Sequence, residues 1–162
     1  MRFCLFISFS AALFLSACAA PLRSSSSYVD SNINAADAIT LANDAAVYLS
    51  KSLSPAKTML VIDPPPTRNV ADELTPAMQT ALREKGYGVL ILSTKNPEKK
   101  EKADPPAGTA LRYLASPLET GVLLRLQFQG IEASRFYQRN KDGALLPNGF
   151  PFTVGGGPND IR

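Results

Sequence analysis

The stretch TMLVIDPPPTRNVADELTPAMQTALREKGYGVLIL, residues 58–92, predicts a strand, a helix and a second strand in succession. Residues 58–62 form an apolar, β-branched run that ends before three prolines, and residues 87–92 form a similar run after Gly86. Between them, residues 72–85 carry apolar side chains at helical spacing. A strand, helix and strand in this order favour two parallel strands joined by a right-handed crossover.

The beginning of this helix has two alternatives, because Pro76 lies close to it. In the first, Thr75 is the N-cap and Pro76 occupies the first helical position. In the second, the helix begins near Asp72 and accommodates the proline in its first turn. In both, Gly86 ends the helix, and its apolar face carries Leu74, Met78, Ala81 and Leu82.

An amphipathic helix is predicted upstream, over residues 35–53. Asn34 suits the N-cap, Asp37 lies in the first turn, and Ser54-Pro55 ends the helix. Spacings of three and four place one set of apolar residues on a single stripe, which we expect to be buried against a sheet. The stripe consists of Ile39, Ala42, Ala46, Leu49 and Leu53.

The C-terminal half is predicted to be antiparallel. Residues 109–115 and 122–129 form strands around a turn at 117–120, and the second of these alternates between apolar and polar side chains. Residues 131–139 continue as a strand, and Asp142-Gly143 forms a hairpin turn before a short strand near 144–146. We therefore predict an α/β (α+β) two-layer sandwich, with two helices on one mixed sheet of about five to six strands.

The N-terminus carries an export signal, with Arg2, an apolar run over residues 3–15 and the string Leu15-Ser16-Ala17-Cys18. The run is shorter than the roughly 20 apolar residues that span a bilayer. The string has the form of a lipobox, so Cys18 is predicted to be acylated and to begin the mature chain. The alternative is ordinary cleavage after a small residue, Ala17, Ala19 or Ala20. Because alanine and not aspartate follows Cys18, we expect the outer membrane as the destination.

These features divide the chain as follows. Residues 1–17 are a lipoprotein signal peptide, and residues 18–33 are an acylated flexible tether without apolar periodicity. Residues 34–154 are a single α/β domain, in which residues 93–108 form an exposed loop rich in proline and mixed charge. Residues 155–162 are a frayed tail.

Composition argues against several classes of function. The chain has no histidine and two cysteines, of which Cys4 leaves with the signal, so neither a disulfide nor the usual zinc ligands are expected in the mature protein. The net charge is only +3, and basic residues are interspersed with acids, which does not indicate nucleic-acid binding. We expect no metal, no cofactor and no small-molecule substrate.

No arrangement of residues indicates catalysis. Asp72 and Glu73 are neighbours whose side chains diverge on a helix, and Lys57 beside Ser54 lacks the buried setting of a serine–lysine dyad. The glycines at 155–157 are followed by neither a lysine nor a helix, as a phosphate loop requires. We therefore expect a protein that is not an enzyme and has no catalytic residues.

Two aromatic residues after the last predicted strand are candidates for a partner contact. Phe150 and Phe152 lie among Pro147, Gly149 and Pro151. Two alternatives stay open for them: they pack on their own domain, or they dock against another subunit.

Several strings, taken in order, resemble the TrbH family, lipoproteins of bacterial conjugative transfer systems. They cover roughly residues 35–150: LANDAA at 41–46, ALREKGYGVL at 81–90, LRY at 111–113, SRFY at 134–137 and DGALLPNGF at 142–150. The resemblance implies a subunit of the mating-pair-formation apparatus, a type IV secretion system, held at the outer membrane on its periplasmic side. It implies no catalytic residues.

The sequence therefore predicts an outer-membrane-anchored lipoprotein that acts as a structural subunit. Its expected partners are other subunits of the secretion core complex, together with the membrane itself through the acyl chains on Cys18. The alternative is a periplasmic envelope-binding module or hydrolase that acts on peptidoglycan or lipid.

Overall fold

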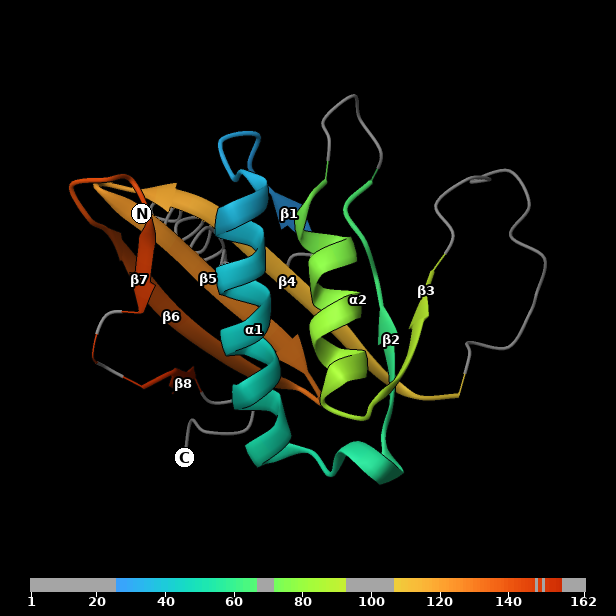
Figure 1. Cartoon of the computed structure of the whole chain (residues 1–162). Helices are drawn as coiled ribbons and strands as arrows, with labels where there is room; N and C mark the ends of the chain where they lie inside the picture. Colours follow the sequence, from blue (N-terminus) through green and yellow to red (C-terminus); the bar gives the residue numbers. More distant parts are fainter. Residues whose placement is uncertain (1–25, 67–71, 93–106, 148, 150, 156–162) are drawn as a thin grey trace, which may run out of the picture.

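Two helices lie on one face of a single mixed sheet in the computed structural model, which describes residues 26–66, 72–92, 107–147, 149 and 151–155 (Figure 1). The predicted fold class, a two-layer α+β sandwich, is confirmed. The sheet has eight strands within the described residues, more than the five to six expected, and its main path runs β3-β2-β4-β5-β6-β7.

The strand, helix and strand of residues 58–92 form as predicted. β2 (Met59–Ile62) and β3 (Gly88–Ile91) pair in parallel, and α2 (Leu74–Glu84) connects them. Of the two alternatives for the helix start, the earlier one is correct, because Pro76 is the third residue of α2. Asp72 accepts hydrogen bonds from the backbone N–H groups of Leu74 and Thr75, both 3.1 Å long. A proline in the first turn removes no intrahelical hydrogen bond.

The upstream helix, α1 (Ala35–Ser52), begins at a capping box. The Asn34 side chain accepts from the N–H of Asp37 at 2.9 Å, and the Asp37 carboxylate accepts in return from the N–H of Asn34. The predicted stripe is wrong at Ile39, which is 57% exposed, and the contact surface is centred on Leu41 and Ala45. The small residues determine which side of α1 is buried, because alanines let the helix approach its neighbours closely. Ala38, Ala42, Ala45 and Ala46 are all buried.

The antiparallel half consists of β4 (Thr109–Leu118), β5 (Gly121–Phe128), β6 (Ile131–Arg139) and β7 (Leu145–Pro147). β4 is three residues longer than predicted and includes Pro117. Pro117 pairs with Val122 of β5 and lies beyond Ala115, where the pairing of β4 with residues 28–29 on its other side ends. A proline is tolerated at such a position. The turn at Asp142-Gly143 is present, with Gly143 at φ +82°.

Two short strands were not predicted. β1 (Tyr28–Val29) pairs with β4 in parallel, and β8 (Thr153–Gly155) pairs with β6. The expected tether over residues 18–33 is therefore corrected, because Tyr28 and Val29 belong to the sheet. The buried hydroxyl of Ser27 donates to the carbonyl of Asp63 and accepts from the N–H of Tyr113 at 3.1 Å. A strand of two residues is too short for periodicity to reveal. Of the predicted loop 93–108, all but the last two residues lie outside the described residues.

The hydrophobic core fills the space between the helices and the sheet. β5 shows the predicted alternation, since Val122, Leu124, Leu126 and Phe128 are buried. Tyr113 and Tyr137 are among the largest fully buried side chains. The sheet therefore buries most of one face beneath α1 and α2.

Candidate functional site

The sheet presents a second face, which points away from both helices. Because side chains alternate along a strand, the neighbours of the buried residues of β4, β5 and β6 point to this side. We call this surface the open face and its opposite the covered face. The central strands contribute these residues to the open face: Arg112, Leu114, Ser116, Leu118, Gly121, Leu123, Arg125, Gln127, Glu132, Ser134, Phe136 and Gln138.

One half of the open face is polar, and its charges are paired. Nε of Arg112 lies 2.9 Å from the carboxylate of Asp63, and Nε of Arg125 lies 3.1 Å from that of Glu132. Gln127 donates from Nε2 to Glu132 at 3.2 Å. These side chains are 23–43% exposed, so each pair contributes at most about 1 kcal/mol to stability. This half carries no net charge from its two ion pairs.

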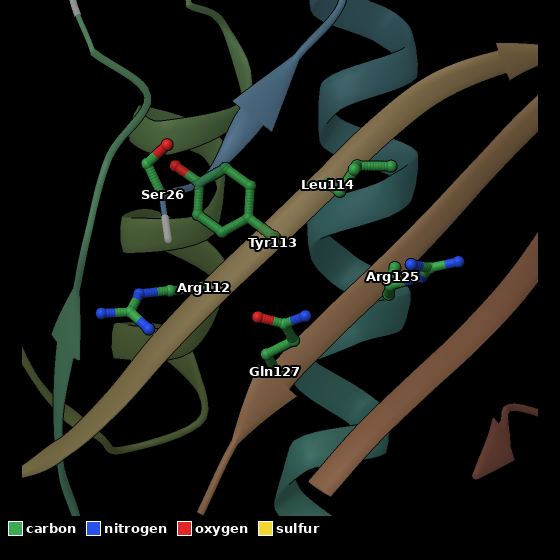
Figure 2. Close-up of a pocket in the computed structure, with 6 residues that line it drawn as sticks. All are labelled: Ser26, Arg112, Tyr113, Leu114, Arg125 and Gln127. Carbon is green, nitrogen blue, oxygen red and sulfur yellow. The ribbon is translucent and has the colours of Figure 1, made fainter. Parts of the chain in front are cut away.

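A shallow hollow lies among these residues. Figure 2 shows it from the open face, with β4 and β5 crossing in front of the helices. It is a depression that is open to solvent. Its wall contains Ser26, so the first residue that the structure describes lies on this side of the sheet. The lining residues are Ser26, Arg112, Tyr113, Leu114, Arg125 and Gln127.

The other half of the open face is apolar. Leu114, Leu123 and Phe136 are half-buried there, and the ring of Phe136 occupies the space above Gly121. A Cβ at Gly121 would lie 2.5 Å from that ring and 2.1 Å from the carbonyl oxygen of Tyr137. Three further apolar residues border this half and are about half exposed: Tyr28 (47%), Leu118 (47%) and Leu146 (52%).

The covered face holds two polar contacts between α1 and β6. Asp37, only 2% exposed, accepts two hydrogen bonds from Arg139, of 2.9 and 2.6 Å. Asp44 accepts from Arg135 at 2.9 and 3.0 Å and from the hydroxyl of Tyr137 at 2.5 Å. Burial, and then the hydrogen bond to Asp44, raise the pKa of Tyr137 far above its usual value. The hydrogen bond to Asp37 raises the pKa of Arg139. These groups fix α1 on the sheet.

The candidate residues from the sequence are placed as follows. Phe152 is buried and stacks on Tyr48 of α1, with ring centroids 4.3 Å apart. The structure thus shows, for Phe152, packing on its own domain. Phe150 and Cys18 lie outside the described residues.

Sequence reasoning did not identify the paired charges. The alternation of residues 122–129 placed Arg125 and Gln127 together on the polar side of their strand. Their acidic partner lies on the next strand, and the partner of Arg112 lies 49 positions away, at Asp63. No local pattern links residues at that separation.

Four acidic residues of the described ranges form ion pairs with arginines: Asp37, Asp44, Asp63 and Glu132. Within the described ranges, no three histidine, cysteine, aspartate or glutamate side chains could jointly hold a metal ion. None of the described helices combines the length and apolar character that crossing a bilayer requires.

These observations define a two-layer α+β domain with one covered face and one open face of mixed polarity. A family model described as Conjugal transfer protein TrbH matches residues 20–154, most of the chain. The chain therefore belongs to the TrbH family of conjugal transfer proteins. Comparisons with the curated proteins and with the solved structures find no significant match.

Proposed function

We propose that this protein is an outer-membrane-anchored lipoprotein and a structural, non-enzymatic subunit of the conjugation apparatus, a type IV secretion system. It acts through contacts with other subunits of the core complex, while acyl chains on Cys18 hold it at the membrane. The observation that carries the proposal is the family match over residues 20–154, directly behind a lipobox at residues 15–18.

The anchor supports this function by a simple physical effect. Each buried methylene contributes about 0.8 kcal/mol to membrane binding, so two or three acyl chains make release negligible. A domain confined to a thin layer meets partners in that layer at high effective concentration, as in linked binding modules. Weak contacts across an exposed surface then suffice for assembly.

The anchor is tested by substituting the two cysteines separately in donor cells. Cys18→Ser is expected to abolish palmitate labelling and co-fractionation with the outer membrane, because the thioether cannot form. Cys4→Ser is the matched control, since it lies in the signal and should leave both readouts unchanged. A mature Cys18→Ser protein that still fractionates with the outer membrane contradicts the anchor.

The structural role is tested by crosslinking and mass spectrometry on membranes of a conjugating donor. Crosslinks to core-complex subunits, and co-purification with them, are the expected result. Deleting the gene and restoring it in trans should abolish and then restore plasmid transfer. A protein isolated as a monomer that binds glycan strands would instead support the envelope-binding alternative.

A further inference from the structure

We infer that in the acylated protein the open face is turned toward the membrane, with its apolar half against the lipid surface and both helices directed away. This inference rests on the proposed acylation of Cys18. It adds an orientation and an interaction surface for which the partner is the phospholipid leaflet that holds the anchor.

The first argument is the point at which the chain becomes fixed to the domain. β1 is paired with β4, and the N–H of Asp30 donates to the carbonyl of Ala115 at 3.0 Å. Ser27 is buried and bonded to two backbone groups, those of Asp63 and Tyr113. From Ser27 onward the chain is therefore part of the sheet and cannot act as a spacer.

The second argument is the side of the sheet on which the preceding residue lies. Ser26 lines the hollow of the open face with Arg112, Leu114 and Arg125 (Figure 2). The described part of the chain thus begins on the open face. In Figure 1, β1 is seen between the upper ends of α1 and α2, where it pairs with β4 of the sheet.

The third argument is the length of the connection. Only seven residues lie between Cys18 and Ser26. The eight Cα–Cα steps that join them give a root-mean-square reach of about 15 Å and a maximum of about 28 Å. To turn the helices toward the membrane, this segment would have to pass around the sheet edge and past a helix layer that is itself about 10–12 Å thick. If the open face is turned toward the membrane, the segment does not have to pass around the sheet.

The composition of the open face suits a lipid surface. Tyr28, Leu118 and Leu146 are each about half exposed beside the half-buried Leu114, Leu123 and Phe136. Tyrosine is enriched at membrane interfaces, since its ring is apolar and its hydroxyl remains wet. Within each of the ion pairs Arg112–Asp63 and Arg125–Glu132, the positive and negative charges cancel. Long-range attraction to anionic lipid is therefore not expected, and proximity comes from the anchor.

The test uses single introduced cysteines in the full mature acylated protein. Leu146→Cys lies on the open face and Ile39→Cys on the outer side of α1, and the two native side chains are 52% and 57% exposed. Because the acylated Cys18 has no free thiol and Cys4 is removed, each variant carries one reactive site. A fluorophore is attached at each site, and the protein is reconstituted in vesicles of phosphatidylethanolamine and phosphatidylglycerol that contain a headgroup-linked quencher.

The expected result is quenching several-fold stronger at position 146 than at position 39. Equal quenching, or stronger quenching at position 39, overturns the orientation. Mass spectrometry and vesicle sedimentation of the same samples report acylation independently, so a protein that lacks acyl chains counts against the proposed function and removes the basis of the orientation as well. If the fluorophore at position 146 is shielded only in membranes that contain the assembled apparatus, the apolar half of the open face contacts a protein and not lipid. That result would also overturn the proposed orientation.

Discussion

The covered face and the open face of the sheet differ in how deeply they bury polar and apolar side chains. On the covered face Leu124 and Leu126 are fully buried, and the ion pair joins Asp37, 2% exposed, to Arg139, 29% exposed. On the open face Leu123 is half-buried, and the pair of Arg125 and Glu132 is about 40% exposed. The same strands therefore supply the core on one side and a weakly stabilising contact surface on the other.

This difference in burial predicts where substitutions should affect the stability of the fold and where they should affect contacts with other molecules. A buried ion pair has lost its water, so either partner left alone is costly. An exposed pair keeps most of its hydration and contributes little. Changes on the covered face should destabilise the domain strongly, whereas changes on the open face should alter its stability little.

Two adjacent leucines on β5 allow the most direct comparison of the covered face with the open face. Leu124→Ala should lower the free energy of unfolding by about 2–5 kcal/mol, because it opens a cavity beneath the helices. Leu123→Ala, one residue earlier and on the open face, should cost less than about 1 kcal/mol. Urea denaturation of the soluble domain, followed by circular dichroism, measures both. Equal losses would mean that something other than solvent covers the open face.

The arginines provide the second comparison. Arg139→Met keeps an apolar stem but leaves the Asp37 carboxylate buried without its partner, at an expected cost of about 3 kcal/mol. Arg125→Met on the open face should cost less than about 1 kcal/mol. The same denaturation experiment applies.

A double variant sharpens this result. Asp37→Asn in the Arg139→Met background removes the unpaired charge and should recover part of the lost stability. If the second substitution adds its own full cost instead, the buried charge is not what destabilises the single variant.

Much of the fold could be predicted because its central elements are long and locally marked. The Asn34 cap, Gly86 after the second helix, and apolar runs of four or more residues are local signals, and the structure follows each of them. The error at Ile39 has a different origin. Spacing alone identified a stripe, but the close approach of small residues, centred on Ala45, rotated the buried side away from it.

The candidate site was less accessible to sequence reasoning. β1 has two residues and is held by the buried hydroxyl of Ser27, whose bonding partners lie far away in the chain. The pairing of Asp63 with Arg112 depends on the order of strands in the sheet, which no local string encodes. The alternation of β5 separated the two faces correctly, but it did not show that both helices cover only one of them.

Two tyrosines that donate to carboxylates extend the comparison to pH. The hydroxyl of Tyr137 donates to Asp44 in the covered layer, and that of the exposed Tyr28 donates to Asp30 at 3.1 Å. Tyr137→Phe should cost about 1–2 kcal/mol at neutral pH, since the carboxylate loses a donor. Tyr28→Phe should change stability little, because water replaces the lost hydroxyl.

At alkaline pH, the stabilities of the wild type and of Tyr137→Phe should depend differently on pH. Burial raises the pKa of Tyr137 above its ordinary value of 10.0, so the folded state keeps this proton at a pH where the unfolded chain releases it. The folded state then binds more protons, and its stability falls as the pH rises above about 10. Tyr137→Phe has no such proton, so its deficit relative to the wild type should shrink between pH 10 and 11. Urea midpoints measured from pH 7 to 11 test this, and parallel curves for the wild type and the variant would show that the phenol is not protected by burial beneath α1.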